Sequence, residues 1–499
     1  MNLYIAALDQ GTTSSRCFLF DKNGKEVSRA QKEHRQIFQK PGYVEHDALE
    51  IWNNCLEVID SAVKQVDFSS ALVAAMGITN QRETIVIWDS ETGQPLHHAI
   101  VWQDMRTQAL VQRIGDFEST LRKRTGLPAS TYFSSTKIQW LLQNVPVIQE
   151  AVREGRALAG TVDSWLIWKF TGGPKRGTHV TDVSNASRTQ LFDLKSEKWD
   201  QELTGYFEIP MSLLPRIAPS IDPKAYGVVS CGSALDGVPI GAVLGDQQAA
   251  LFGQVCFLPG EAKNTYGTGN FLLLNTGNHI VHSSSGLLST VAYQFANAPP
   301  VFALEGSAAV TGSAVQWLRD QLRIIRNASD IEELANQVED NGGVYFVPAF
   351  SGLYAPYWRP DVRGLITGLS RFNTAAHLAR ATLEAICYQT KEVLDAMKTD
   401  SQQEISILKV DGGPTANSTL MQLQADILGI PVIKPVVSET TALGAAYAAG
   451  LSTGVWSDSN ELRSHAQIDR QWDPQWSQDQ REQGYRGWKK AIHQVLHQE

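Results

Sequence analysis

The chain has 499 residues, of which 43% are hydrophobic and 19% charged, and it carries a net charge of −9. At roughly 150 residues per domain, a soluble globular protein of about two to four domains is expected. The acidic balance argues against nucleic acid as the main partner, because binding to a phosphate backbone relies on clustered Lys and Arg.

The cysteines and the apolar runs indicate a cytoplasmic protein. No two of the five cysteines form a CxxC pair, and their odd number and wide spacing favour reduced thiols over a disulfide framework or a zinc site. These cysteines are Cys17, Cys55, Cys231, Cys256 and Cys387. The apolar run at 3–8 is too short for a signal core, and no run of about twenty apolar residues predicts a membrane span.

The first half is predicted to begin with strands. Apolar runs predict strands at 3–8, 17–20, 26–31, 72–79 and 84–88. Apolar residues at helical spacing predict a helix over 47–65, with Asp47 as its cap. Further along, helices are expected around 104–114 and 136–144, an apolar stretch at 163–170, a loop at 172–174 and an irregular Pro- and Gly-rich segment over 215–238.

The second half alternates strands and longer helices. A domain boundary is expected near 240–255, and we divide the chain into domains 1–247 and 248–499. Strands are predicted at 240–244, 271–275, 287–295, 301–305, 405–411 and 431–434, and helices at 307–324, 374–398, 416–428 and 440–451.

Two glycine- and threonine-rich turns, about half the chain apart, suggest an internal repeat. Each lies between a strand and a second strand that runs back, at residues 9–13 and 265–269. A duplicated domain with a cleft between the copies explains this pattern. The alternative is that such hairpin turns are simply common.

The first of these turns has the chemistry of a phosphate site. Successive backbone N–H groups and the hydroxyls of Thr12, Thr13 and Ser14 favour an anion, and Arg16 adds positive charge. Asp9, at the end of the strand, suits a hydrated Mg²⁺. No Walker motif occurs in the chain, and the alternative is a purely structural turn.

Two later segments are further candidates for phosphate or nucleotide binding. The turn at 267–269 could hold a second phosphate in the same way as the first. Residues 411–417 end a strand and open a helix, which is a favoured place for ligands in α/β sheets. The alternative for this third segment is a turn with a helix cap.

Polar residues at two other strand ends suit a small hydroxylated acceptor. Residues 80–83, Asn-Gln-Arg-Glu, follow an apolar strand, although a surface turn would look the same. Asp246 follows another strand and could act as a general base or as a helix cap. Trp102 and Tyr132 offer an apolar wall and a phenolic donor, although such residues more often belong to a core.

Taken together, these segments resemble the FGGY family of carbohydrate kinases over essentially the whole chain. The stretches that carry the family resemblance are residues 7–16, 132–141 and 364–384. Other stretches are similar to those of family members that act on glycerol: residues 77–84, 99–103, 160–169, 245–253 and 264–269.

The resemblance implies an α/β protein with two ribonuclease-H-like domains, of the actin, hexokinase and Hsp70 type, and a cleft between them. It implies ATP-dependent phosphorylation of glycerol to sn-glycerol 3-phosphate, with Asp246 as the general base, and a homodimer or homotetramer. The implied substrate residues are Arg82, Glu83, Trp102, Tyr132, Asp246, Gln247 and Phe271. For ATP or ADP they are Thr12, Thr13, Ser14, Arg16, Thr268, Gly312, Gln316, Gly413 and Asn417, with Asp9 for Mg²⁺.

Two segments depart from the family pattern. Met105 stands where relatives often have Arg or another polar residue, and residues 228–238 do not match the loop through which some bacterial relatives sense a sugar bisphosphate. A histidine used by other relatives for phosphotransferase control is also missing there, so regulation stays open.

Two alternative functions are kept. The first is another FGGY kinase for a polyol or ketose, against which Arg82, Glu83 and Trp102 argue because together they suit a three-carbon polyol. The second is a non-catalytic nucleotide-dependent sensor on the same fold. That alternative predicts loss of Asp9 and Asp246, and both are present.

Overall fold

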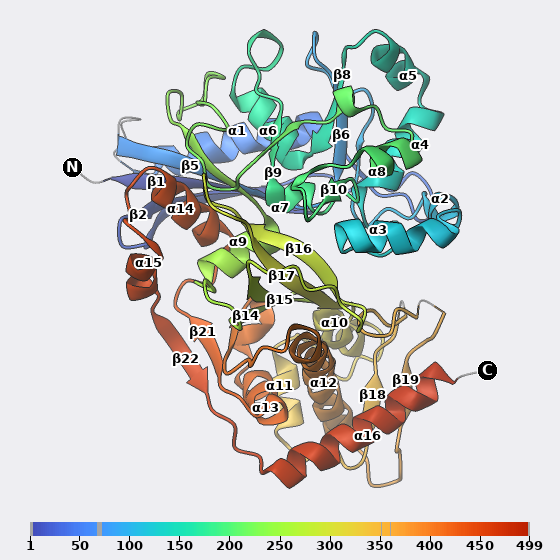
Figure 1. Ribbon diagram of the computed structural model, residues 1–499. Helices are drawn as coiled ribbons and strands as arrows, with labels where there is room; N and C mark the ends of the chain where they lie inside the picture. The colour runs from blue at the N-terminus through green and yellow to red at the C-terminus, as the bar shows by residue number, and fades with distance from the viewer. Residues whose placement is uncertain (1–2, 67–71, 351, 360, 498–499) are drawn as a thin grey trace.

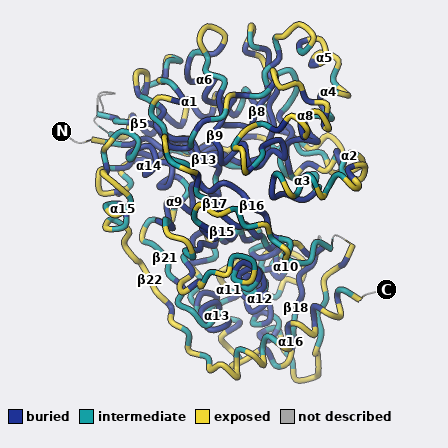
Figure 2. Tube along the Cα trace, in the orientation of Figure 1, coloured by how far each residue is buried: buried dark blue, intermediate teal, exposed yellow. Residues whose placement is uncertain are grey.

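The computed structural model describes residues 3–66, 72–350, 352–359 and 361–497. Figure 1 shows two lobes, with the first half of the chain above and the second half below. Each lobe is built around one mixed β-sheet. The buried part of the trace in Figure 2 follows these sheets and continues through the junction between the lobes.

The sheet of the upper lobe has the order β13-β5-β1-β2-β3. Strand β1 is antiparallel to β2 and parallel to β5, which is in turn parallel to β13. Their bounds are β1 Tyr4–Gln10, β2 Ser14–Asp21, β3 Glu26–Glu33, β5 Val73–Asn80 and β13 Ile240–Gly245. Gln10, Asn80 and Gly245 lie in one row of the register, so the residues that follow these three strands meet at one edge.

The sheet of the lower lobe repeats this arrangement. Its order is β16-β17-β15-β14-β20-β21-β22. The strands are β14 Ala262–Tyr266, β15 Asn270–Gly277, β16 Leu288–Tyr293, β17 Val301–Ala308, β20 Leu408–Asp411, β21 Val432–Pro435 and β22 Ile468–Trp472. The run β17-β15-β14-β20-β21 has the order and strand directions of β3-β2-β1-β5-β13. The hypothesis of a duplicated fold is therefore confirmed.

Side chains that alternate between the two faces along β1 explain how the upper sheet is covered on both sides. Ala6 and Leu8 pack into the core that includes helix α1, Ala48–Lys64, whereas Ile5 and Ala7 pack against helix α14, Thr440–Ser452. As predicted, Asp47 caps α1, because its carboxylate accepts hydrogen bonds from the first turn. Helix α14 comes from the second half of the chain and so ties the two lobes together (Figure 1).

The remaining elements of the first half form the outer part of the upper lobe. A second sheet has the order β4-β7-β6-β8, with bounds Glu45–His46, Ala99–Ile100, Ile85–Asp89 and Ala157–Thr161. The short strands are β9 Val180–Asp182, β10 Phe192–Asp193, β11 Lys198–Trp199 and β12 Arg216–Ala218. The helices are α2 Gln108–Gln112, α3 Glu118–Thr125, α4 Ser134–Asn144, α5 Pro146–Arg153, α6 Val162–Phe170, α7 Val183–Ala186 and α8 Gln201–Tyr206.

The lower lobe is completed by helices on its sheet and an outer helix at its end. The helices are α10 Gly312–Asp320, α11 Asp330–Ala335, α12 Ala375–Ser401, α13 Ser418–Leu428 and α16 Gln478–Leu496, with β18 Tyr345–Val347 and β19 Leu365–Thr367 paired beside them. Helix α15, Ser459–His465, packs into the core cluster of α14 at the junction. Within the described ranges, none of the helices is long and apolar enough to cross a membrane.

Most predicted elements are confirmed, and the differences lie at segment ends. The helix expected from residue 307 begins at Gly312 because β17 continues to Ala308. The helix expected over 104–114 shrinks to Gln108–Gln112, and a 3₁₀ turn occupies Gly173–Lys175 where a loop was expected. Helices α3, α5, α7, α8, α11, α15 and α16, several short strands and strand β22 were not predicted.

Two helices cross at the junction with almost no space between their backbones. Helix α9, Asp246–Gly253, packs on α14, and a Cβ on Gly444 would lie 1.8 Å from the carbonyl oxygen of Ala249. A Cβ on Gly253 would lie 2.0 Å from the carbonyl oxygen of Thr440. Only glycine permits this approach, so the contact between the lobes depends on these two positions.

Gly444→Ala should therefore destabilise the protein. The added methyl group meets the backbone of another helix, which cannot rotate away, so we expect a loss of about 1–3 kcal/mol in the free energy of unfolding. Chemical denaturation followed by circular dichroism measures it. The matched control is Gly205→Ala, since Gly205 also lies in a helix but has no atom near the position of its Cβ. Equal stability of the two variants would contradict the close crossing.

Candidate active site

The acceptor side of the candidate site is centred on Arg82 and Asp246. Arg82 follows strand β5, Asp246 opens helix α9, and the Arg82 Nε lies 3.0 Å from the Asp246 Oδ1. The Arg82 side chain is only 2% exposed, whereas that of Asp246 is 28% exposed. The structure therefore presents an accessible carboxylate that is oriented by a buried guanidinium group.

Asp246 is not the helix cap that the sequence allowed as an alternative. Gly245 occupies the cap position, and the Asp246 carboxylate instead accepts a hydrogen bond from the backbone N–H of Gln247. Burial raises the pKa of Asp246, and the charge of Arg82 opposes this rise. A carboxylate with a raised pKa is a better proton acceptor, as a general base requires.

Glu83 lies beside Arg82 in a strained backbone conformation. Its φ of 59° lies in the left-handed region, which costs a residue other than glycine about 1–3 kcal/mol and is commonest at functional sites. Its carboxylate accepts a hydrogen bond from Arg188 Nε at 2.7 Å, and burial raises its pKa. The polar segment predicted at residues 80–83 is thus a buried connection rather than a surface turn.

Gln247 and Phe271 are brought together by a lysine that the sequence did not single out. Lys263 Nζ donates hydrogen bonds to the side chains of Gln247 and Thr265 and to the carbonyl oxygen of Phe271. Burial lowers the pKa of Lys263 to about 8. This lysine joins residues of both lobes around the same space.

Trp102 and Tyr132 form a half-buried aromatic pair, and Tyr132 also packs against a small core cluster of Leu127, Phe133 and Leu288. Their rings meet edge to face with centroids 5.4 Å apart. The Trp102 indole N–H donates a hydrogen bond to the Thr12 hydroxyl at 3.0 Å. The aromatic wall is therefore connected directly to the first phosphate turn.

The first phosphate turn joins β1 to β2 as predicted. The backbone N–H of Gly11 donates to the carbonyl oxygen of Ser14 at 2.9 Å, and Thr13 is exposed at the tip. Arg16 forms ion pairs with Asp9 at 2.5 Å and with Glu439, from the lower lobe, at 2.6 Å.

Asp9 has the properties of a ligand for a hydrated cation. Burial raises its pKa, and the nearby charge of Asp246 acts in the same direction. A cation held by Asp9 would offset this repulsion, and oxygen donors suit Mg²⁺. Within the described residues no group of three or more acidic, His or Cys side chains could hold a metal by itself, so phosphate oxygens would have to complete the coordination.

The second turn, between β14 and β15, packs on the start of helix α10. The backbone N–H of Gly312 donates to the carbonyl oxygen of Gly267, and a Cβ at Gly312 would lie 2.5 Å from that oxygen. Thr268 is exposed at the tip of the turn, and Gln316 is exposed on α10 about one turn beyond Gly312.

The third segment follows β20 and combines a turn with a cap. Gly412 has φ of 93° and packs against the backbone of Tyr266, and Gly413 is exposed with open space around it. Asn417 caps helix α13 by accepting a hydrogen bond from the backbone N–H of Leu420. The side-chain oxygen of Asn417 serves as the cap, so the NH₂ donors of the same amide stay available to a ligand.

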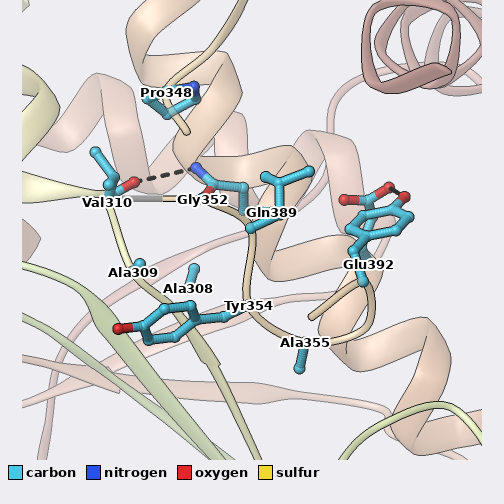
Figure 3. A pocket seen from close by; sticks show the side chains of 11 residues that line it. Ala308, Ala309, Val310, Pro348, Gly352, Tyr354, Ala355, Gln389 and Glu392 are labelled. Atoms are coloured by element: carbon cyan, nitrogen blue, oxygen red, sulfur yellow. Dashed lines mark hydrogen bonds between the residues drawn. The ribbon is translucent and has the colours of Figure 1, made fainter. Parts of the chain in front are cut away.

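The site residues therefore fall into two sets. The acceptor residues and Thr12 share one network of hydrogen bonds, ion pairs and ring contacts, in which the Arg188 guanidinium group lies over the Tyr132 ring, 5.8 Å from its centroid. In the described part of the chain no hydrogen bond joins the first phosphate turn to the second or third. A small cavity of about 10 Å³ lies beside Ala308, Ala309 and Val310, directly before the start of α10 at Gly312, and there Gln389 donates a hydrogen bond to the Val310 carbonyl oxygen (Figure 3). Met105 is 56% exposed and lies outside the network.

Three charged residues of this network were not predicted from the sequence: Arg188, Lys263 and Glu305. Glu305 accepts hydrogen bonds from both Arg82 and Arg188, so it lies at the centre of the buried charges. The signal for Lys263 and Glu305 was a single charge inside a strand of otherwise apolar or neutral residues. Such a charge costs free energy unless it is paired, and so it marks a site.

Known proteins that are similar to this chain belong to one family of kinases. The model of the N-terminal domain of the FGGY family of carbohydrate kinases matches residues 4–253, and that of the C-terminal domain matches residues 262–453. Glycerol kinase 1 of Streptomyces coelicolor is 58% identical over 99% of this chain and 98% of its own length. Glycerol kinase of Mycobacterium tuberculosis H37Rv is also 58% identical, over 99% of this chain and 96% of its own.

Solved structures show the same fold. The crystal structure of Plasmodium falciparum glycerol kinase with ADP has a TM-score of 0.93 and 37% sequence identity, covering 100% of this chain and 99% of that one. Gluconate kinase from Lactobacillus acidophilus, at 22% identity and a TM-score of 0.86, covers 99% of this chain and 97% of its own and shares the fold alone. Since the two family models together match most of its length, the chain belongs to the FGGY family of carbohydrate kinases.

Proposed function

We propose that this protein transfers the γ-phosphoryl group of ATP to glycerol, giving sn-glycerol 3-phosphate and ADP. The observation that carries the proposal is the full-length similarity, at 58% identity, to proteins named glycerol kinase. The accessible Asp246 carboxylate beside the buried Arg82 supports it, since a kinase for a neutral polyol needs a proton acceptor beside fixed hydrogen-bond donors.

Glycerol is small and neutral, so its recognition has to come from fixed polar groups. In our proposal the hydroxyls bond Arg82, Glu83, Tyr132, Asp246 and Gln247. Trp102 and Phe271 pack against the carbon edge. A site built to hydrogen-bond a hydroxyl strongly rejects analogues that lack it, because its buried polar groups are then left unpaired.

The proposed chemistry is a direct displacement at phosphorus. The attacking hydroxyl of glycerol gives its proton to Asp246, its oxygen forms a bond to the γ-phosphorus, and the bond from phosphorus to the β,γ-bridging oxygen breaks to release ADP. Phosphoryl transfer needs alignment and charge stabilisation more than covalent help. The ion pair between Arg82 Nε and Asp246 Oδ1, at 3.0 Å, supports this alignment.

Both lobes would hold the nucleotide. We assign it to the three turns, through Thr12, Thr13, Ser14, Arg16, Thr268, Gly312, Gln316, Gly413 and Asn417. Mg²⁺ bound with the nucleotide would neutralise charge on its phosphate oxygens, and Asp9 would help to hold it. Arg16 has to exchange part of its pairing with Asp9 and Glu439 for a phosphate, which couples nucleotide binding to the contact between the lobes.

Other properties implied by the family are also proposals. The division into domains 1–247 and 248–499 falls within the first turn of α9, whereas the two family models match residues 4–253 and 262–453. A homodimer or homotetramer and a cytoplasmic location are proposed from the family resemblance. Light scattering on the purified chain gives its mass in solution and so tests the proposed oligomeric state.

Release of ADP from MgATP should be stimulated strongly by glycerol and little by pentuloses, hexuloses or longer polyols. A coupled assay over a panel of acceptors measures this directly. Stimulation by a ketose instead would establish another kinase of the same family. No stimulation by any acceptor would favour the sensor alternative.

Asp246→Asn should keep the fold and nucleotide binding but lose most turnover. The amide cannot accept the hydroxyl proton, so kcat should fall roughly 10²- to 10⁴-fold. Nucleotide titration and the free energy of unfolding serve as controls, and both should stay close to the wild-type values. Turnover near the wild-type rate would exclude Asp246 as the base.

A further inference from the structure

Five buried or partly buried charges of alternating sign form one continuous chain through the candidate site. In order, they are Glu83, Arg188, Glu305, Arg82 and Asp246. The links are Arg188 Nε to Glu83 Oε1 at 2.7 Å, Arg188 Nη2 to Glu305 Oε1 at 3.1 Å, and Arg82 Nε to Asp246 Oδ1 at 3.0 Å. Arg82 and Glu305 form two hydrogen bonds, of 2.5 and 3.0 Å.

Glu305 is the only member of this chain that comes from the sheet of the lower lobe. It lies in strand β17, whereas Arg82, Arg188 and Glu83 belong to the first half of the chain, and Asp246 opens the junction helix α9. The ends of the chain are the two carboxylates proposed for the acceptor. The geometry of the acceptor site is therefore fixed by a side chain from the opposite lobe.

A count of donors shows what Glu305 does to Arg82. The guanidinium group has five N–H donors, and Glu305 takes one from each Nη. Gln248 lies 3.3 Å from Nη1 and takes a third. Nε lies 3.0 Å from Asp246 in an ion pair, and within the described residues the Nε–H and one Nη2–H donate to no protein acceptor. The bidentate pair with Glu305 fixes the plane of the guanidinium group and so directs these two donors.

We propose that Glu305 is a positioning residue for the acceptor: from strand β17 it holds Arg82 and Arg188, and through them it orients Asp246 and Glu83. Glu305 itself touches no substrate in this account. The inference rests on the proposed function, because it assigns a role in binding and activating the acceptor hydroxyl.

The charges around Glu305 favour its ionised form. Burial alone would raise its pKa, but the charges of Arg188 and Arg82 together lower it to about 2. The same negative charge contributes to the raised pKa of Asp246, against which Arg82 acts. Lys263 is the other cation near Glu305 and Asp246. Removing the charge of Glu305 should therefore leave Arg82 free to lower the pKa of Asp246.

The test compares Glu305→Gln, which keeps the reach of the side chain, with Glu305→Asp, which keeps the charge. For Glu305→Gln we expect kcat/KM for glycerol to fall about 10²-fold, since small misplacement of reacting groups costs about this much. KM for ATP should change little. The acid limb of the pH profile of kcat/KM should move to lower pH, because Asp246 loses a nearby negative charge.

For Glu305→Asp we expect KM for glycerol to rise while the acid limb stays at the wild-type pH. The shorter side chain no longer spans both guanidinium groups, but the charge remains. This variant keeps the proposal testable should the glutamine variant fail to fold. The matched control is Glu384→Gln, another buried glutamate that pairs with an arginine, Arg380 at 3.1 Å, outside the site. It should keep the wild-type kinetics.

Different outcomes separate the two claims. Absence of glycerol-dependent turnover in the wild type would overturn the proposed function. If the wild type is active but Glu305→Gln shows an unshifted acid limb and equal losses in kcat/KM for glycerol and for ATP, the positioning role is excluded. Glu305 would then only neutralise the charge of two buried arginines. Wild-type kinetics in both Glu305 variants would overturn the inference outright.

Discussion

The ion pair between Arg82 and Asp246 is the interaction on which the rest of the site depends. It joins the end of strand β5 to the start of helix α9 at the edge where the parallel strands of the upper sheet finish. A buried guanidinium group cannot remain unpaired, because desolvation of an isolated charge costs more than folding can offset. Asp246 and Glu305 supply the pairing, and the same pairing orients the proposed base.

The architecture explains why this pair lies between two lobes. Each lobe repeats one strand order, so each places polar residues at the same edge of its own sheet. The crossing of α9 on α14 holds the two lobes together, and it needs glycine at positions 253 and 444. Glu305 from β17 and Glu439 from the loop before α14 then pair with arginines of the upper lobe. Any movement of the lobes must therefore change the surroundings of Arg82 and Arg16.

Much of the fold could be predicted from the sequence because its signals are local. Apolar runs predicted most strands of the two large sheets but not β22, which is largely exposed, and the two glycine- and threonine-rich turns indicated the duplication. Helix α16 was missed because its buried face is narrow: only Trp488, Ala491, Ile492 and Val495 are buried in a helix that is otherwise polar. The predicted start of α10 was wrong because strand β17 continues three residues beyond the apolar run at 301–305 from which it was predicted.

The candidate site was predicted less completely, for a physical reason. Residues in recognisable segments, such as Asp9, Arg82 and Asp246, could be named. The sequence did not single out Arg188, Lys263 and Glu305. Arg188 and Glu305 pair with residues more than a hundred positions away in the chain, and Lys263 pairs with Gln247 across the junction. Single charges within strands were the available signal. Pairings of this kind follow only once the lobes are placed together.

The most direct test of this account is a single-turnover measurement of phosphoryl transfer to glycerol as a function of pH. If Asp246 accepts the proton, the rate of the chemical step should fall on the acid side, with an apparent pKa above the ordinary range for an aspartate, because burial raises that of Asp246. The Asp246→Asn variant should lose this dependence together with most of the rate. A chemical step whose rate is independent of pH over the same range would contradict a role for Asp246 as the base.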